Sequence, residues 1–574
     1  MKLSKNIVPV VILVGMAVSC TPGVLKDAPD TKKDSRKDFG RDTEGINIDR
    51  YKHIYYVSNR GSDENGEGSK EVPFASLQKA IKMVSAASES DPAAIFVAAG
   101  AYVGGPFQMV SHIDLYGGFD PGSWERDIEK NKTVLSGGDR DRVLVAVDHT
   151  RLDGFYLINS RFRGNGGAIY CNGTSPEISN NFFFGNKSLG PIPWNPANIH
   201  EKAHDGGAIY AENGASPIIR NNIFVGNETE NGRGAAIAFF DRCNGVIRNN
   251  VFLRNSAGLS DQQRSSDGGA VSVFDWCDTE VTDNLFIGNR ALAKNDGGGL
   301  FVALWSSARI TGNYFFNNEA MDDAGALFVG GQEHRYDVPL DPLPPAEEYY
   351  VQVRGNVFMG NRNPSLNSGA TRMTMESRGE FSNNLAAFNN GVYFQRSDLA
   401  IYNNTIIDNL LLIETKEGLN PCRMKNTLVM GKIDIQIEAD ISFSLLLDTN
   451  KEKPSVQVSF VEDEIKLETI DVMTGDERLE TRLVVQGDYK QNSLKNRIVR
   501  AGNRFTLVKY NQGNEIFLWD DLSAERDFLI MPSYTPDSGS AVIDAGTDAG
   551  LDSDLYGNPR PHGKTFDIGA VEVQ

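Results

Sequence analysis

A phrase that begins with Gly-Gly-Ala and ends with Asn-Asn, aromatic residues and Gly-Asn recurs between Gly166 and Asn409. The fullest copies read GGAIYCNGTSPEISNNFFFGN from Gly166 and GGAIYAENGASPIIRNNIFVGN from Gly206. One Asn anchors each copy, and successive anchors lie 20 to 43 residues apart: Asn181, Asn222, Asn250, Asn284, Asn313, Asn356, Asn384 and Asn404. Self-similarity at so short a period means that one supersecondary unit is stacked many times.

The repeat unit is built from strands. Its apolar runs are short, rich in β-branched and aromatic residues, and bounded by Gly and Asn, and no amphipathic helical stretch separates them. We therefore expect an all-β fold, a right-handed parallel β-helix with three strands and three turns per coil and coils about 4.8 Å apart. An aliphatic column should point inward, and the Asn column should form a hydrogen-bonded ladder at a left-handed turn. The aliphatic column comprises Ile169, Ile209, Ile237, Val271, Leu300 and Leu327.

The repeats occupy residues 137–450, and the flanking segments have other patterns. Residues 50–136 should form an N-terminal cap and the first coils, with a strand at 53–58 and an amphipathic helix at 74–84 that covers the open end of the rod. That helix would bury Leu77, Ala80, Ile81 and Val84. Residues 451–530 contain strand-like runs without the Gly and Asn columns, and either a small β-domain or irregular coils would fit them. Residues 531–574 form a closing segment.

Two segments carry a family resemblance. YYVSNRGSDENGEGSKEVPFASLQKAI, followed by AAGAYV and DLYGGFD, resembles the opening of bacterial right-handed parallel β-helix proteins of the pectate-lyase-like superfamily. SGSAVIDAGTDAGLDSDLYGNPRPHGKTFDIGAVE is similar to the closing segment of surface proteins of the choice-of-anchor Q type. The resemblance implies a surface protein that meets extracellular carbohydrate, and polysaccharide lyases of this fold use calcium with an Arg or Lys base.

The N-terminus predicts export and a lipid anchor. Residues 1–19 have the basic start and short apolar run of a signal peptide, and small residues precede Cys20 as in a bacterial lipobox. Cys20 is then the lipid attachment site and residues 20–49 a flexible tether; the alternative is an ordinary cleaved signal with an incidental Cys. By resemblance, Thr21 favours the outer membrane of the bacterial cell envelope. The net charge of −19 argues against nucleic acid and anionic lipid as partners, so the membrane would be met through the anchor only.

The four remaining cysteines suggest no zinc site, because no CxxC spacing is present. Cys243 and Cys277 occupy the same column of successive coils, where the spacing is within disulfide range. A disulfide and a pair of buried free thiols are both compatible with this placement.

Long insertions in one turn, at residues 187–205, 256–267 and 290–296, and a further one at 332–350, should wall a groove along the strand that begins with Gly-Gly-Ala. Aromatic residues would face that groove, where their rings suit the C–H faces of sugars. The alternative is that the insertions cover and bury the rings. The candidate substrate-binding residues are Tyr170, Tyr210, Phe240, Phe274, Trp276, Phe301 and Trp305, with Phe328 in the same column as Phe301.

A polar column stands immediately before the Gly pair of each repeat: Asn165, Asp205, Arg233, Asp267, Asp296, Asp323 and Asn367. Stacked carboxylates repel, so Asp267, Asp296 and Asp323 are candidate ligands of a cation, calcium by the resemblance. Arg233, Asp267 and Asp296 are the candidate catalytic groups. The competing explanation is turn chemistry, because Asp-Gly is a favoured turn pair. The Asp-Asp and Gly-His-Gly signatures of the related hydrolases are absent from the repeats.

The function expected from the sequence is therefore that of a surface-anchored β-helix lipoprotein. It would bind extracellular polysaccharide, or a host or cell-surface glycan as an adhesin, through the looped groove. The alternative is a cation-dependent polysaccharide lyase, and no cofactor other than calcium is indicated.

Overall fold

A computed structural model describes residues 39–573 except 43–44, 85–86, 191–203, 259–265, 332–344, 346–347, 365–367, 415–418, 421, 438, 451–455, 457, 461–463 and 475–478. The expected signal peptide, Cys20 and most of the tether lie outside the described residues, as do Asn367 and much of three insertions. Within the described part, no helix is long and apolar enough to cross a membrane.

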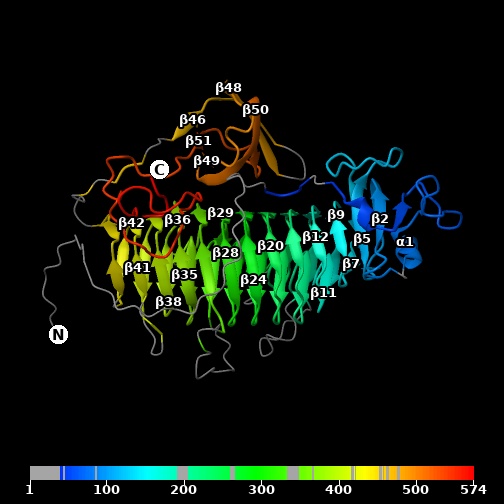
Figure 1. The fold of residues 1–574 in the computed structure, drawn as a ribbon, viewed down its shortest axis with the longest axis horizontal. Helices are drawn as coiled ribbons and strands as arrows, with labels where there is room; N and C mark the ends of the chain where they lie inside the picture. The colour runs from blue at the N-terminus through cyan, green and yellow to red at the C-terminus, as the bar shows by residue number, and fades with distance from the viewer. Residues whose placement is uncertain are drawn as a thin grey trace.

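The chain winds into an elongated rod of stacked coils in which every inter-strand pairing along the rod's long sheets is parallel (Figure 1). The 14-stranded sheet runs, in spatial order, through β1 (His53–Val57), β2 (Ala93–Ala98), β5 (Ile113–Phe119), β8 (Arg151–Asp153), β12 (Glu177–Ser179), β16 (Ile218–Arg220), β20 (Val246–Arg248), β24 (Asp278–Thr282), β28 (Ser307–Thr311), β32 (Val351–Arg354), β35 (Arg378–Ser382), β38 (Asp398–Tyr402), β41 (Arg423–Lys425) and β44 (Asp440–Ser442).

Two further long sheets and one short sheet complete the coils. The 13-stranded sheet comprises β3 (Gly100–Val103), β6 (Thr133–Ser136), β9 (Tyr156–Ile158), β13 (Phe182–Phe184), β17 (Ile223–Val225), β21 (Val251–Leu253), β25 (Leu285–Ile287), β29 (Tyr314–Phe316), β33 (Val357–Met359), β36 (Leu385–Ala387), β39 (Thr405–Ile407), β42 (Leu428–Gly431) and β45 (Leu445–Asp448). The 12-stranded sheet comprises β4 (Phe107–Gln108), β7 (Leu144–Val145), β11 (Ile169–Asn172), β15 (Ile209–Glu212), β19 (Ile237–Phe240), β23 (Val271–Phe274), β27 (Leu300–Ala303), β31 (Leu327–Gly330), β34 (Thr371–Thr374), β37 (Val392–Gln395), β40 (Leu410–Ile413) and β43 (Ile433–Ile435). The short sheet comprises β10 (Arg161–Arg163), β14 (Lys187–Leu189), β18 (Glu228–Thr229), β22 (Ser256–Ala257), β26 (Arg290–Ala291) and β30 (Glu319–Ala320).

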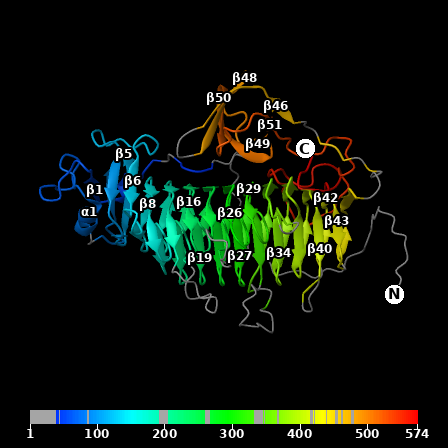
Figure 2. The same ribbon diagram turned by 180° about the vertical axis from the view of Figure 1, so that it is seen from behind.

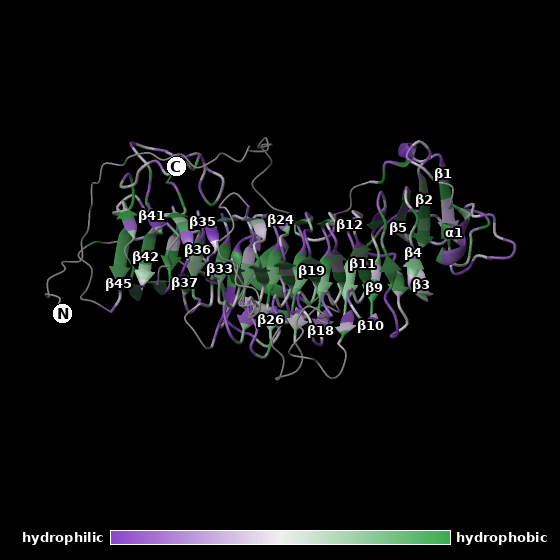
Figure 3. Cartoon of the chain, turned by 90° about the horizontal axis from the view of Figure 1, so that it is seen from below, coloured by the Kyte–Doolittle hydropathy of each residue, from purple (hydrophilic) through white to green (hydrophobic). Residues whose placement is uncertain are grey.

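The core of the rod is a set of stacked columns, one residue per coil. The predicted aliphatic column from Ile169 to Leu327 is confirmed, since its members pair in register and none is exposed to solvent. A second inward column consists of stacked phenylalanine rings with centroids 4.6 to 5.0 Å apart: Phe183, Phe224, Phe252, Phe286, Phe315 and Phe358. The strands of the long sheets are accordingly rich in hydrophobic residues, and the short strands β10, β18 and β26 lie along a more hydrophilic edge (Figure 3).

The predicted Asn ladder is also confirmed. The side-chain oxygen of Asn222 accepts hydrogen bonds from the backbone N–H of Asn181 at 2.9 Å and from its side-chain amide at 3.1 Å, and the same pattern repeats as far as Asn404. The left-handed residue of the turn is the one before each ladder Asn, for example Asn221 with φ of 58°. Hydrogen bonding, rather than backbone conformation, therefore requires Asn in this column.

The N-terminal end of the rod is capped as predicted. Helix α1 (Leu77–Met83) begins at Ser76, whose side chain accepts a hydrogen bond from the backbone N–H of Lys79. The predicted apolar face is buried, with Leu77 and Ala80 unexposed, and the helix covers the end of the rod beside β1 and β2 (Figure 1). The 3-10 helix η1 (Ile48–Arg50) precedes β1.

Residues 465–530 form a six-stranded antiparallel sheet in the spatial order β46, β51, β49, β50, β48, β47, which decides between the alternatives left open for this region. It lies against the flank of the rod, on the same side as the C-terminal segment (Figures 1 and 2). Its strands are β46 (Ile465–Leu467), β47 (Thr469–Thr474), β48 (Glu480–Tyr489), β49 (Ile498–Ala501), β50 (Arg504–Trp519) and β51 (Phe528–Ile530).

The outer face of the 13-stranded sheet is apolar and covered. Side chains such as Ile223, Leu253 and Met359 pack there against Phe505 and Trp519 of the six-stranded sheet. Phe39 joins the same cluster, and the Arg41 side chain donates to the backbone oxygens of Asn180 and Ile128. Residues 39–42, placed in the flexible tether by the sequence, are therefore docked on the rod because they complete this apolar face. We call them the docked N-terminal segment.

Candidate functional site

The predicted aromatic columns lie on the outer face of the 12-stranded sheet. Rings of successive coils stack, with centroids 6.1 Å apart for Tyr170 and Tyr210, 5.9 Å for Phe240 and Phe274, and 5.2 Å for Phe301 and Phe328. Most of these rings are covered: the exposed fraction is 2% or less for Tyr210, Phe274, Phe301, Phe328 and Trp305. Tyr170, Phe240 and Trp276 are partly exposed. A sugar could reach only these three rings without a movement of the chain around the others.

Arginine side chains cover two of the outward rings. The guanidinium of Arg142 lies 4.6 Å from the Tyr170 ring centroid, and that of Arg233 lies 4.1 Å from the Phe274 centroid. Arg233 is 5% exposed, and its Nε lies 3.5 Å from a carboxylate oxygen of Asp205. The candidate catalytic base Arg233 is therefore engaged with an aromatic ring and a carboxylate.

The acidic column forms a hydrogen-bonded ladder of its own. The Asp267 carboxylate accepts the backbone N–H of Asp296 at 3.0 Å, and the Asp296 carboxylate accepts that of Asp323 at 2.9 Å. The Asp205 carboxylate likewise accepts the backbone N–H of Arg233 at 2.7 Å. These side chains thus satisfy the backbone at the turn before each Gly pair, as the turn-chemistry explanation requires.

This arrangement gives no support to the expected calcium site at Asp267, Asp296 and Asp323. The carboxylates are stacked along the rod and do not converge, and no group of three or more His, Cys, Asp or Glu side chains in the described part of the chain is placed to hold a metal ion. Burial, together with the charges of Asp267 and Asp323, raises the pKa of Asp296 well above its ordinary value. Burial also raises the pKa of Asp323, which Arg372 opposes through an ion pair. The raised pKa of Asp296 and the ion pair of Asp323 with Arg372 both reduce the like-charge repulsion within the column.

The proposed Cys243–Cys277 disulfide is not formed. Both cysteines are free and buried, and each thiol is directed at the carbonyl oxygen three residues earlier, at 3.1 Å for Cys243 and 3.2 Å for Cys277. Burial and the neighbouring Cys243 raise the pKa of the Cys277 thiol. Cys243 and Cys277 are therefore a pair of buried free thiols, the alternative that the sequence left open.

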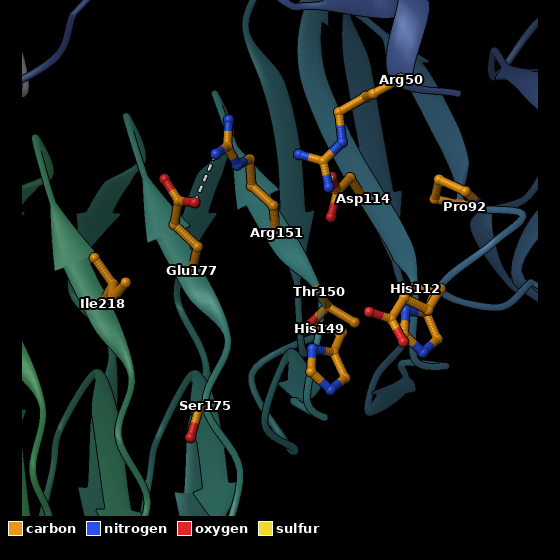
Figure 4. Close-up of a pocket in the computed structure, with 11 residues that line it drawn as sticks. Arg50, Pro92, His112, Asp114, His149, Thr150, Arg151, Ser175, Glu177 and Ile218 are labelled. Atoms are coloured by element: carbon orange, nitrogen blue, oxygen red, sulfur yellow. Dashed lines mark hydrogen bonds and ion pairs between the residues drawn. The ribbon is translucent and has the colours of Figure 1, made fainter. Parts of the chain in front are cut away.

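An open cavity of about 350 Å³ lies on the outer face of the 14-stranded sheet, beside the N-terminal cap (Figure 4). Strands β5, β8 and β12 pair in register there, so that the outward residues Asp114, Arg151 and Glu177 form a row across three coils. We call this cavity the cap-end pocket. It is lined by Arg50, Glu89, Pro92, His112, Asp114, His149, Thr150, Arg151, Ser175, Glu177 and Ile218.

Charged groups of the cap-end pocket are held in fixed positions. Arg151 pairs with Glu177 at 2.6 Å, and the other Glu177 oxygen lies 2.8 Å from the Arg220 guanidinium of the next coil. Asp114 accepts the Tyr51 hydroxyl at 2.5 Å and lies 3.5 Å from Arg50. Burial, together with the Asp114 charge, raises the pKa of Tyr51, so this hydroxyl stays protonated and fixes the Asp114 carboxylate.

Two histidines form the wall of the cap-end pocket at the start of β5 and β8 (Figure 4). The rings of His112 and His149 stack nearly parallel with centroids 4.9 Å apart, and both residues have left-handed φ, 64° and 57°. Their backbones are linked by a hydrogen bond of 2.9 Å from the His112 N–H to the His149 carbonyl. With Arg50, whose side chain is 48% exposed, they give the pocket accessible N–H donors on an outer face.

The cap-end pocket could not be predicted from the repeat, because most of its residues come from the irregular first coils. One signal was available: His112 and His149 each stand just before a strand with similar sequence, IDLYGGF and RLDGFYL. Aligning these two segments would have placed the histidines in one column.

Comparison with known families bears on the handedness of the coils. Residues 131–328 match the family model described as the right handed beta helix region. The chain is a right-handed parallel β-helix. This agrees with the sheet topology and with the predicted fold class.

Solved structures with similar folds are distant. XylC in complex with xylose is 12% identical, with 91% of this chain and 98% of that chain covered and a TM-score of 0.44. Pectate lyase Pel9A is 12% identical, with 91% and 97% covered and a TM-score of 0.29. The tailspike protein gp49 from Acinetobacter baumannii bacteriophage Fri1, a capsular polysaccharide depolymerase, is 11% identical, with 84% and 87% covered and a TM-score of 0.27. None of the curated proteins compared with the chain matches it.

Proposed function

We propose that the protein binds an acidic extracellular carbohydrate in the cap-end pocket, without chemistry. The observation that carries this proposal is the open cavity in which Arg50, His112 and His149 offer N–H donors beside the fixed carboxylates of Asp114 and Glu177. Guanidinium and imidazole groups bind the carboxylate or sulfate of an acidic sugar, while carboxylates accept hydrogen bonds from its hydroxyls.

The surrounding surface supports a polymer rather than a small isolated ligand. Two outward columns continue beyond the pocket on the 14-stranded sheet. The column of Arg151 and Glu177 passes through Ile218 and Val246 to Glu280 and Arg309, and the neighbouring column carries Arg220, Arg248 and Arg354. Successive coils place equivalent outward residues about 4.8 Å apart. An extended acidic glycan that lies along the rod could therefore contact one such residue after another. Because the whole chain carries a net charge of −19, binding of a polyanion depends on the arginines of these two columns.

Titration calorimetry with acidic and neutral oligosaccharides tests the proposal. Wild-type protein should bind the acidic series, and Arg50→Gln should weaken binding about tenfold or more, since a charge-assisted hydrogen bond contributes on the order of 1.5–3 kcal/mol. His149→Asn is a second variant, because Asn tolerates the left-handed backbone of that position. Arg140→Gln, at an exposed Arg outside the pocket, is the matched control and should bind as wild type. Equal binding by all three variants would refute the placement of the site.

The same titrations decide between binding and lyase chemistry. No observation favours the lyase. The carboxylates of Asp267 and Asp296 accept backbone N–H groups, and the Arg233 side chain lies beside the Asp205 carboxylate. Mixtures of protein and polyuronate, with and without calcium, should give no rise in ultraviolet absorbance from new double bonds. A rise that is lost on chelation and in Asp296→Ala would establish the lyase instead.

We further propose that the protein is a lipoprotein of the bacterial outer membrane, attached through Cys20, with a cell-surface or host glycan as its partner. The support is the sequence of residues 1–20. Cys20→Ser should release the protein from the membrane fraction. Unchanged fractionation of this variant would contradict the anchor.

A further inference from the structure

The two ends of the rod are finished in different ways. At the N-terminal end, helix α1 covers the first coil and Phe74 bridges to β1, so that Val57 is unexposed. At the other end, β43, β44 and β45 are each the last strand of their sheet, and no strand that the structure describes pairs with their free edges (Figures 1 and 2). The chain continues onto the flank, where Val458 and Phe460 pack on the outer face of the 13-stranded sheet.

The inward residues of this last coil are only half-buried. They continue the core columns of the rod, and we call them the open end: Ile433, Ile435, Ile441 and Leu446. One coil earlier the same columns hold Leu410, Leu412, Met424 and Val429, none of which is more than 1% exposed. The core is thus closed by the next coil everywhere along the repeats and left uncovered here. A further layer of strands would bury this aliphatic surface and stabilise the end.

The backbone of β44 shows how such a layer can be added. Asp440 donates its N–H to the Cys422 carbonyl of the preceding coil at 3.1 Å. Successive residues of a strand direct their N–H and C=O groups to alternate edges, so those of Ile441 face out of the rod. Two copies of β44 that pair antiparallel about Ile441 exchange two hydrogen bonds between their Ile441 backbones. In this register Asp440 stands opposite Ser442 of the second copy, and no carboxylate faces another.

We infer that the protein forms a two-fold dimer in which two rods meet end to end through the open end. β44 pairs with its own copy, and β43 lies against β45 of the second copy. A head-to-tail chain of rods is disfavoured, because α1 and the segment around Phe74 cover the first coil and leave it no edge for a second open end. The dimer does not depend on glycan binding, since the cap-end pocket lies at the opposite end of the rod.

Sedimentation velocity over about a hundredfold range of concentration tests the dimer. The full chain carries Cys20→Ser throughout, so that no lipid drives association. It should sediment as a concentration-dependent equilibrium between one chain and two. Ile441→Pro removes an N–H that faces out of the rod and none that the preceding coil uses, and Ile435→Lys places a charge in the contact. Each should weaken the dimer about tenfold or more.

A matched control and a second measurement keep a damaged fold from being mistaken for a lost contact. Val103→Lys changes a 66% exposed apolar residue near the capped end and should leave the dimer unchanged. Amide exchange of the parent Cys20→Ser chain should slow at Ile433, Ile441 and Leu446 as concentration rises, which requires no change at the open end. A single chain at every concentration, species that grow beyond two chains, or a dimer that both open-end variants retain would each overturn the inference.

Discussion

At the residue scale, the rod is held by side chains that repeat one hydrogen-bond pattern in every coil. Asn284 is representative: its side-chain oxygen accepts two hydrogen bonds from Asn250, and its amide donates to the Ile247 carbonyl at 2.8 Å. A second ladder, which the sequence analysis did not separate from the Gly-Asn motif, follows the same rule from Asn186 to Asn389. The ladder positions are buried, so each amide satisfies backbone groups that water cannot reach.

Removal of one ladder amide should therefore be costly. Asn284→Ala leaves the Asn250 N–H and the Ile247 carbonyl buried without partners, and we expect unfolding to become easier by about 2–5 kcal/mol. The exposed Asn244→Ala is the control and should change stability by about 0.5 kcal/mol or less. Denaturant unfolding of both variants measures the difference; equal stabilities would show that the ladder bonds contribute little.

The second ladder ends on a carboxyl group where the other coils have an amide. Asp408 accepts the Asn389 side-chain amide at 2.8 Å, and burial raises the pKa of Asp408 to about 7. A carboxyl whose pKa is higher in the folded than in the unfolded chain contributes stability below about pH 4, and this contribution is lost as the pH rises through 7.

Asp408→Asn should consequently stabilise the protein at high pH and not at low pH. We expect equal melting temperatures near pH 4 and a higher one for the variant at pH 8, with a difference in unfolding free energy of at most about 4 kcal/mol for three pKa units. Asp488→Asn, at an exposed position of β48, serves as the control. A stability difference that does not vary with pH would contradict the raised pKa.

The residues that could be predicted from the sequence are those that recur. The aliphatic column and the first Asn column were identified because one position returns in every repeat, and the period alone assigns such positions to a ladder. The burial of Phe274 and Phe301 could not be predicted in the same way. It depends on contacts with side chains outside the repeated column, such as Arg233 over Phe274 and Leu304 in the same cluster. The cap-end pocket depends on the pairing of β5, β8 and β12, whose sequences lack the motif.

At the element scale, left-handed Asn residues at the edges of the 13-stranded sheet attach the segments that cover it. The Asn317 side chain exchanges two hydrogen bonds with the backbone of Phe505 in β50, at 2.7 and 2.9 Å. The Asn426 side chain makes the same kind of pair with the backbone of Thr547 in the closing segment. Each side-chain amide thus makes one donated and one accepted hydrogen bond with the backbone of the covering segment, as a neighbouring strand would.

Each attachment should be separable from the other. Asn317→Gly keeps the left-handed turn, φ 54°, and removes both bonds to β50, so amide exchange at residues 504–507 should rise about tenfold or more. Asn426→Gly should raise exchange at residues 546–548 and leave β50 unchanged. Exchange that rises in both segments in either variant would mean that the two coverings are one cooperative unit.

The strands of residues 465–530 were visible in the sequence, but their arrangement was not. Runs such as RFTLVKY and EIFLWD alternate in a way that indicates strands, yet antiparallel pairing and docking on the rod depend on the apolar outer face of the 13-stranded sheet. The repeat does not indicate that another segment covers this face, because aliphatic residues such as Ile223 and Leu253 are equally typical of a column that points into the core.

At the scale of the whole molecule, the three long sheets have different surroundings. The 13-stranded sheet is covered by the docked N-terminal segment, the six-stranded sheet and the closing segment, while the 12-stranded sheet carries aromatic columns that are largely buried. The 14-stranded sheet presents alternating charged residues and the cap-end pocket to solvent. The proposed glycan site is therefore on the 14-stranded sheet, and not in the groove beside the Gly-Gly-Ala strand that the sequence suggested.

The most direct test of this account is a crystal structure of the full chain soaked with an acidic hexasaccharide. We predict sugar density in the cap-end pocket, with a carboxylate or sulfate group within hydrogen-bond distance of Arg50 and beside His112 and His149. Further sugar units should lie along the column of Arg220 and Arg248 on the 14-stranded sheet. Density over Tyr170, Phe240 and Trp276 on the 12-stranded sheet, with the cap-end pocket empty, would contradict it.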